Sequence, residues 1–349
     1  MAAGAGGTKT GTNGADRLYV EPPAFAALDL GTNNCRLLIA EPCTGARGFR
    51  VVDSFSRIVR LGEGLHDSGR LAEGAIARTI DALEVCADKI YRRQAAHVRC
   101  VATQACRAAS NGEDFLAQAQ RRTGLIFEII TPEEEARLAV LGSLDLACAS
   151  YDVALVVDVG GGSTELCWID APAAARAAGA RNASPPILAW TSLPVGVVTL
   201  AERFREGASE DWREAMRDHV RHTVAQFRGA DTLKTTFQNG RGHVIGASGT
   251  VTSLAGVHMG LPRYDRAAVD GVWMDMRDAH ATAAQLGAMS QTERAAQPCI
   301  GPQRADLVLA GAAILEAIDS EWPSARMRVA DRGLREGVLR VMMHAHALA

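Results

Sequence analysis

Apolar residues follow two kinds of pattern along this chain: short continuous runs, and longer stretches in which they recur every three to four positions. Short runs bounded by turn residues are typical of buried strands, and the recurrent pattern is typical of amphipathic helices. The clearest helix is predicted over residues 72–93, where Ile76, Ile80, Leu83, Ala87 and Ile90 form one face. Further helices are predicted around 114–122, 131–147, 198–204, 211–229, 251–258, 305–318 and 334–343, and further strands at 25–30, 35–40, 48–52, 98–102, 126–130, 187–191 and 327–330.

The most informative strand ends in a glycine-rich turn. Residues 153–157 are apolar and lead into Asp158, and the glycines at 160–162 precede a second apolar run at 166–169. We interpret this as a β-hairpin, because glycine lets backbone amides crowd in a tight turn without Cβ clashes. Crowded amides can cradle a phosphate, and Asp158 and Glu165 at the ends of the turn could share a divalent cation. A Walker loop or a dinucleotide fingerprint requires a helix directly after the glycines, so the pattern argues against both.

The same pattern occurs earlier in the chain. Residues 26–30 form a strand pattern that includes Asp29, and Gly31 then opens a polar turn before another apolar run begins. When Asp29 is aligned with Asp158, Gly31 falls on Gly160. One glycine turn alone is weak evidence for a ligand site. Two turns in the same strand context predict a duplicated unit whose phosphate-facing turns look at each other across a cleft.

Residues 131–135 carry the signals of a helix start. Thr131 suits the N-cap position, Pro132 suits the first turn, and Glu134 would complete a capping box. Acidic residues at this end of a helix need no further function, because the helix dipole favours them. Glu135 differs from its neighbours in having no evident structural role. We therefore treat Glu135 as a candidate functional residue.

Two other patterns leave alternatives open. Residues 244–250 form a third strand-to-turn pattern, but here a helix follows. Ser248, Gly249 and Thr250 could therefore bind an anion through their backbone amides, or could simply cap the helix. A basic cluster near the end of the sequence could guide a polyanion or lie on a solvated face. It consists of Arg326, Arg328, Arg332 and Arg335.

Composition and charge narrow the classes of function. The 349 residues, 48% of them hydrophobic, are enough for two domains with a core each. A formal charge of -3 and a pI near 6.3 exclude a general nucleic-acid binder. No apolar stretch reaches the ~18–20 residues of a membrane span, and residues 1–21 are predicted to be a disordered leader. The eight cysteines contain no C-x-x-C pair, which is typical of reduced thiols in a cytoplasmic protein.

Taken together, these stretches resemble the exopolyphosphatase and guanosine pentaphosphate phosphohydrolase family. The resemblance implies two α/β domains of the actin-like class (sugar kinase, Hsp70 and actin; ribonuclease H-like), with the active site in the cleft between them. We expect the domains at 22–138 and 139–349, with the last helix at 334–346 packing back on the first. The matching segments are 26–34 (AALDLGTNN), 59–65 (VRLGEGL), 102–111 (ATQACRAASN), 131–138 (TPEEEARL), 157–166 (VDVGGGSTEL), 246–255 (GASGTVTSLA), 304–315 (RADLVLAGAAIL) and 329–339 (VADRGLREGVL).

The resemblance also implies roles for particular residues. Glu135 matches the general base that activates water, and Asp158 and Glu165 match the residues that hold Mg2+. Asp29 could hold a metal-bound water or a second cation, and Arg107 matches an arginine that contacts phosphate. The residues that match the phosphate-binding turns are Gly31, Thr32, Asn33, Asn34, Gly160, Gly161, Gly162 and Ser163.

The resemblance leaves more than one substrate open. Inorganic polyphosphate, hydrolysed at its terminal phosphoanhydride, is the first expectation, and guanosine pentaphosphate is the alternative with the same catalytic residues. The fold alone would also permit an ATP-dependent kinase or, less consistently with Glu135, a non-enzymatic sensor. The sequence stops near where longer family members continue into a helical region. We therefore expect a weaker grip on long polymers, which a homodimer could compensate.

Overall fold

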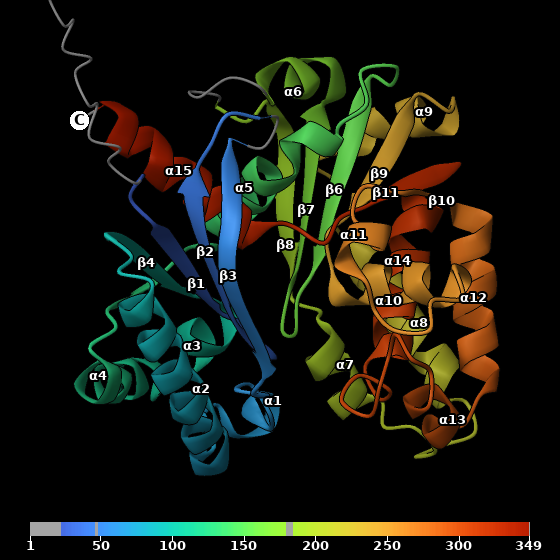
Figure 1. The fold of residues 1–349 in the computed structure, drawn as a ribbon. Coiled ribbons are helices and arrows are strands. Elements are labelled where there is room, and N and C mark those ends of the chain that lie inside the picture. Colours follow the sequence, from blue (N-terminus) through green and yellow to red (C-terminus); the bar gives the residue numbers. More distant parts are fainter. Residues whose placement is uncertain (1–21, 46–47, 179–183, 349) are drawn as a thin grey trace, which may run out of the picture.

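The structure, a computed structural model, describes residues 22–45, 48–178 and 184–348, and the predicted leader at 1–21 lies outside them. Two mixed sheets lie side by side (Figure 1). The first sheet has the order β3-β2-β1-β4-β5 and the second the order β10-β11-β9-β6-β7-β8. The strands are β1 Phe25–Leu30, β2 Asn34–Pro42, β3 Phe49–Ile58, β4 His97–Ala102, β5 Phe127–Ile129, β6 Val153–Val159, β7 Thr164–Asp170, β8 Ile187–Leu193, β9 Gly242–Gly246, β10 Trp273–Asp275 and β11 Arg326–Val329.

The two sheets repeat one topology. In the first, β1, β2 and β3 are antiparallel neighbours, and β4 and β5 continue on the other side of β1 in parallel. In the second, β6, β7 and β8 form the antiparallel part, and β9 and β11 continue in parallel from β6. The short strand β10 is added antiparallel at the edge. The predicted duplication and the actin-like α/β fold class are therefore confirmed.

The first sheet and its helices form what we call the first unit; its three longest helices were predicted, and the two short helices at 65–68 and 104–108 were not. The helices are α1 Leu65–Ser68, α2 Glu73–Arg92, α3 Gln104–Ala108, α4 Gly112–Thr123 and α5 Pro132–Ser143, followed by the short helix η1 Leu144–Leu146. Helix α2 buries Ile76, Ile80 and Leu83 in one cluster with Leu28 and Leu37 of the sheet. Burial of each such side chain stabilises the fold by ~1.5–3 kcal/mol, so the predicted apolar face is what fixes α2 on the sheet.

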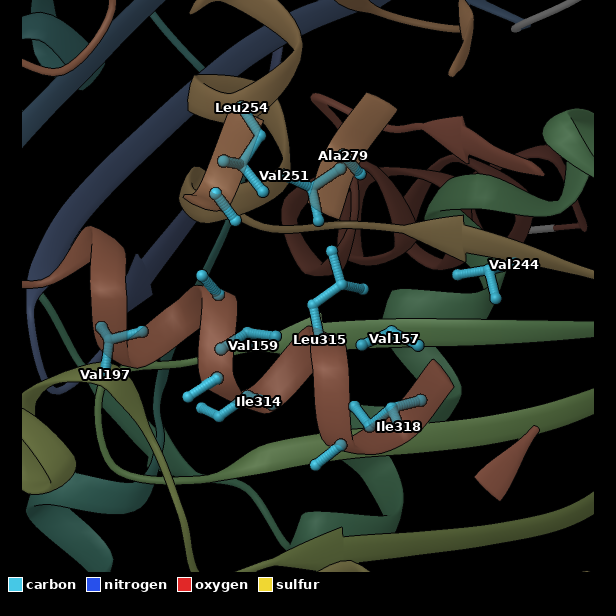
Figure 2. Close-up of a cluster of buried hydrophobic side chains, with 14 of the residues drawn as sticks. Val157, Val159, Val197, Val244, Val251, Leu254, Ala279, Ile314, Leu315 and Ile318 are labelled. Carbon is cyan, nitrogen blue, oxygen red and sulfur yellow. The ribbon is translucent and has the colours of Figure 1, made fainter. Parts of the chain in front are cut away.

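The second sheet and its helices form the second unit, and its hydrophobic core is larger than that of the first unit. Its helices are α6 Ala171–Ala177, α7 Val197–Arg203, α8 Trp212–Ala225, α9 Asp231–Gln238, α10 Gly249–His258, α11 Arg266–Val269, α12 Met276–Ala288, α13 Gln291–Ala295 and α14 Val308–Glu321. Figure 2 shows Ile314, Leu315 and Ile318 of α14 among side chains of β6 and α10. Helix α14 is apolar on almost every side because it is enclosed by β6, α8, α10 and α12.

Helices α5 and α15 (Leu334–Leu348) lie between the two sheets, and α15 packs against β1 and β2 as well as α5. Their backbones touch. A Cβ on Gly142 would lie 1.9 Å from the Gly333 carbonyl oxygen, and one on Gly337 would lie 2.0 Å from the Leu138 oxygen. This close packing fixes the start of α5, and therefore Glu135, relative to both sheets. Among the described residues, none of the helices combines the length and apolar character needed to span a bilayer.

Candidate active site

A cleft between the two sheets brings together nearly all of the predicted site residues. Both glycine turns contribute to its wall, as do Glu135 at the start of α5 and the turn before α10. The predicted residues that line it are Asp29, Gly31, Thr32, Asn33, Asn34, Glu135, Asp158, Gly160, Gly161, Gly162, Ser163, Glu165, Ser248, Gly249 and Thr250. The duplicated turns thus face one cleft, as the sequence predicts.

The two glycine turns have the same internal geometry and touch each other. The amide of Gly31 donates to the Asn34 carbonyl at 2.9 Å, and the amide of Gly160 donates to the Ser163 carbonyl at 2.9 Å. A Cβ on Gly161 would lie 2.9 Å from the Thr32 Cβ. Glycine is therefore required where the turns meet, because a side chain would separate them.

Four carboxyl groups gather at this meeting point: Asp29 of β1, Glu135 of α5, Asp158 of β6 and Glu165 of β7. Burial raises the pKa of each. For Asp158, burial and then the Glu165 carboxylate raise the pKa to about 8. For Glu135, burial and then Glu165 raise the pKa well above its ordinary value, while Arg107 opposes the rise. So many buried carboxylates favour a bound cation.

Two residues hold these carboxylates in place. The Ser192 hydroxyl on β8 donates to Glu165 Oε1 at 2.8 Å. Arg107 donates to the Ile130 carbonyl at 2.6 Å and to Gln104 Oε1 at 2.9 Å, and its Nη2 lies 3.3 Å from Glu135 Oε2. Arg107 is absent from the cleft wall. In this structure its visible contact is with the proposed base, and its predicted contact with phosphate stays a prediction.

The start of α5 differs in one detail from the predicted capping box. Thr131 Oγ1 accepts from the Glu134 amide at 3.1 Å, as expected of an N-cap. The Glu134 carboxylate, however, accepts from Arg137 at 2.7 Å and from Arg99 of β4 at 3.4 Å. The capping box is therefore wrong, because two arginines outcompete the Thr131 amide for this carboxylate. Glu134 still has a structural partner, and of the three glutamates at this helix start only Glu135 lines the cleft.

The turn before α10 serves as a cap and lines the cleft at once. Ser248 Oγ accepts from the Val251 amide at 3.1 Å, which is the capping alternative. Ser248, Gly249 and Thr250 nevertheless line the cleft, so the positive end of the α10 dipole points towards it. The two interpretations left open by the sequence are compatible.

Sequence reasoning missed three arginines at the cleft, Arg36, Arg266 and Arg304, whereas Arg332 and Arg335, which also line it, belong to the predicted basic cluster. Arg36 lies opposite Asp29 in the β1–β2 pairing, a position that the aligned hairpins could have revealed. Arg335 belongs to the basic cluster, which is not one solvated face. Arg332 is buried between Asp145 and Asp270, and the Arg326 guanidinium lies 4.1 Å from the centre of the Trp273 ring.

The donor set fits a partly hydrated hard cation. Among the described residues, no group of three or more His, Cys, Asp and Glu side chains is arranged to hold a metal by itself. Mg2+ is usually bound by one or two carboxylates together with water and substrate phosphates, so a closed protein cage is not required. The buried Oδ1 atoms of Asn33 and Asn34 have no hydrogen-bond partner. They add oxygen acceptors beside the carboxylates.

Phosphate-sized glycine turns, clustered carboxylates and a surrounding set of arginines define a site for phosphoryl transfer. The family model of the Ppx/GppA phosphatase family matches residues 38–346. Exopolyphosphatase 2 of Mycobacterium tuberculosis is 33% identical over 303 residues, which cover 85% of this chain and 90% of the relative. The chain belongs to the Ppx/GppA phosphatase family, and it is a phosphoanhydride hydrolase.

Solved structures agree with this assignment. The crystal structure of the Ppx/GppA family member of Aquifex aeolicus matches with a TM-score of 0.73 and 28% identity, covering 93% of this chain and 98% of the other. An exopolyphosphatase from Cytophaga hutchinsonii matches with a TM-score of 0.78 and 24% identity, covering 92% of this chain and 98% of the other. At that identity, the second match supports the fold alone.

Proposed function

We propose that the protein is a Mg2+-dependent exopolyphosphatase that removes the terminal phosphate of inorganic polyphosphate. The observation that carries the proposal is the position of Glu135, which shares one cleft with the Asp158–Glu165 pair and both glycine turns. A terminal phosphoanhydride requires an in-line water, a base and neutralisation of charge on the transferred group. The cleft offers a residue for each requirement. The name of the Mycobacterium tuberculosis relative supports polyphosphate as the substrate.

The turns and arginines bind and orient the polymer. The residues of the two glycine turns and of the α10 start line the cleft, and their remaining backbone amides suit the oxygens of successive phosphates. Arg36, Arg266, Arg304 and Arg335 supply positive charge along the same cleft. These groups hold the last phosphate between the turns and extend the polymer towards the arginines.

Glu135 accepts a proton from the attacking water. As the water oxygen bonds to the terminal phosphorus, the bond from that phosphorus to the bridging oxygen breaks. The shortened polyphosphate leaves with the bridging oxygen, and orthophosphate is released. Burial strengthens Glu135 as a base, and Arg107 at 3.3 Å stabilises its ionised form and fixes its orientation. Mg2+ held by Asp158 and Glu165, with Asp29 near a metal-bound water, would neutralise charge on the phosphoryl oxygens.

The deciding experiment measures phosphate release from long polyphosphate, short polyphosphate and guanosine pentaphosphate, with Mg2+ and without an acceptor. We expect Glu135→Gln to lower kcat by ~10²–10⁴ with little change in KM, because the base acts in the transition state. Glu134→Gln is the matched control, since Glu134 is the neighbouring glutamate that pairs with Arg137. Full turnover in Glu135→Gln would remove Glu135 as the base. A preference for guanosine pentaphosphate would replace the proposed substrate with its alternative.

A further inference from the structure

Residues 59–64 form a loop, which we call the closing loop, that packs against the wall of the cleft. It is tied to the first glycine turn: the amides of Val59 and Arg60 donate to the Asn33 carbonyl at 2.9 and 3.0 Å, and the amide of Gly62 donates to the Thr32 carbonyl at 2.9 Å. A Cβ on Gly62 would lie 2.3 Å from Thr32 Cγ2, so the loop packs directly on the turn. The first glycine turn therefore holds the closing loop in place.

The same loop reaches across to the second unit. The Arg60 guanidinium pairs with Asp306 at 2.9 Å and lies 3.3 Å from the Gln303 carbonyl oxygen. The Gly64 amide donates to Glu202 Oε1 of α7 at 3.0 Å. Arg60 has a φ of 48°, a left-handed backbone conformation that is unusual for a residue other than glycine. Contacts on both sides hold the loop in that conformation.

The closing loop separates the cleft from a second hollow. Thr32 and Asn33, which bind the loop, line the cleft. The second hollow is lined by Arg60 and Gly64 of the loop and by their partners Asp306 and Glu202, and Leu307 lines both spaces. Five carboxylates line the second hollow (Glu63, Asp67, Glu202, Glu206 and Asp306), and three of them form ion pairs, with Arg78, Arg294 and Arg60 respectively for Glu63, Glu206 and Asp306. The wall thus has the first glycine turn on one side and a separate hollow, most of whose carboxylates are paired, on the other.

Such a wall would distinguish a terminal phosphate from an internal one. A terminal phosphorus bears three non-bridging oxygens, and the turns can enclose all of them. An internal phosphorus carries a second bridging oxygen, so a further stretch of polymer must leave the site on the other side. The closing loop, which is tied to both units, occupies that space.

We propose that the Arg60–Asp306 pair and the Gly64–Glu202 contact restrict the enzyme to polymer ends, which makes them the determinants of exopolytic cleavage. The inference rests on the proposed function, because it assumes polyphosphate in the cleft. Each contact is partly exposed, with 34% and 29% of the Arg60 and Asp306 side chains accessible, so one substitution alone has a small effect. Both contacts are removed together in Asp306→Ala/Glu202→Ala.

The test compares linear polyphosphate with the same polymer blocked at both ends by phosphoramidate groups. Orthophosphate release and the length distribution of the products are followed for the wild type, the double variant and a matched control. Glu63→Gln is that control, because it breaks a 2.6 Å ion pair of the same loop with Arg78, which stays within the first unit. We expect the double variant to cut the blocked polymer into fragments at least about tenfold faster than the wild type and the control.

Binding supplies a readout that does not depend on turnover. In a Glu135→Gln background, a fluorescent blocked polymer should bind the double variant at least about tenfold more tightly than the protein with the loop contacts intact. Fragments from the blocked polymer in the wild type, or unchanged binding and no fragments in the double variant, would overturn the inference. Absence of orthophosphate release from linear polymer by the wild type would instead refute the proposed function.

Discussion

The two glycine turns are built alike but differ in the residue that faces each aspartate across its hairpin. Asp29 lies opposite Arg36, whereas Asp158 lies opposite Glu165. Both aspartates are buried, and burial raises the pKa of both. Arg36 and Arg335 counteract this rise for Asp29, while Glu165 adds to it for Asp158. One scaffold thus places an arginine opposite the aspartate in one copy and a second carboxylate opposite it in the other, where Glu165 raises the pKa of Asp158 more than Arg36 lowers it.

This difference assigns separate tasks to the two copies. A pair of carboxylates with no opposing arginine in its hairpin lowers its energy by taking up a divalent cation. An aspartate opposite an arginine gains little from a cation, and the arginine leaves positive charge for phosphate oxygens. We therefore expect the second turn to be the cation side of the cleft and the first turn the phosphate side. Variants in equivalent positions should behave differently.

The largest effect is expected for Glu165→Gln. Loss of one carboxylate weakens the expected cation site. Because a bound metal contributes several kcal/mol to charge neutralisation in the transition state, kcat should fall by about 10³-fold. Asp29→Asn is the comparison in the other turn and should lower kcat by about tenfold or less. Calorimetric Mg2+ titration of the free protein separates the two, because Glu165→Gln should bind Mg2+ weakly and Asp29→Asn like the wild type. Equal losses of Mg2+ affinity would show that both turns hold the cation.

Much of this arrangement could be predicted from the sequence because the relevant signals are local. Strand runs that end in Asp29 and Asp158 locate both hairpins, and their alignment gives the duplication. The start of α5 follows from Thr131 and Pro132, and Thr131 is the N-cap. The residues matched by family resemblance line one cleft, apart from Arg107. Local patterns identify elements and turns, and here the functional residues lie at their ends.

The features that escaped prediction depend on contacts between distant segments. Arg36 and Arg304 have ordinary positions in the sequence, and it is the crossing of the two units that brings both near Gly249. The Arg99 partner of Glu134 was missed because it comes from a strand 35 positions away. The basic cluster was treated as one group, although Arg326 lies on the Trp273 ring and Arg335 lines the cleft. Spacing along the chain carries no information on such tertiary partners.

A second prediction concerns two equivalent histidines. His97 of β4 pairs with Phe25 of β1, and His243 of β9 pairs with Ala154 of β6, each four positions before the aspartate of its hairpin (29 − 25 and 158 − 154). Burial lowers the pKa of His243 from 6.5 to about 4. The unfolded chain takes up a proton near pH 6.5, and the folded protein does not until about pH 4. The free energy of unfolding should therefore fall by up to about 3 kcal/mol over this range.

Denaturant titrations at several pH values measure this loss. The part of the acid sensitivity that is due to His243 should disappear in His243→Gln, whatever stability the variant has at pH 7. His97→Gln is the matched control, since His97 is partly exposed in the equivalent position and should leave the slope unchanged. Wild-type acid sensitivity in His243→Gln would place the effect elsewhere.

The smallest expected effect compares the turns themselves. A Cβ on Gly161 would lie 3.1 Å from the Asn33 backbone nitrogen and 2.9 Å from the Thr32 Cβ, so Gly161→Ala must push the two turns apart. A Cβ on Gly31 would meet its nearest neighbour, the Asn34 carbonyl oxygen, at an ordinary 3.6 Å. We expect Gly161→Ala to lower kcat/KM by about tenfold, because overpacking typically costs 1–3 kcal/mol, and Gly31→Ala to stay within about twofold. If Gly31→Ala were the more damaging variant, free space around the first turn would be needed for phosphate binding. The contact between the turns would then matter less than the room inside each one.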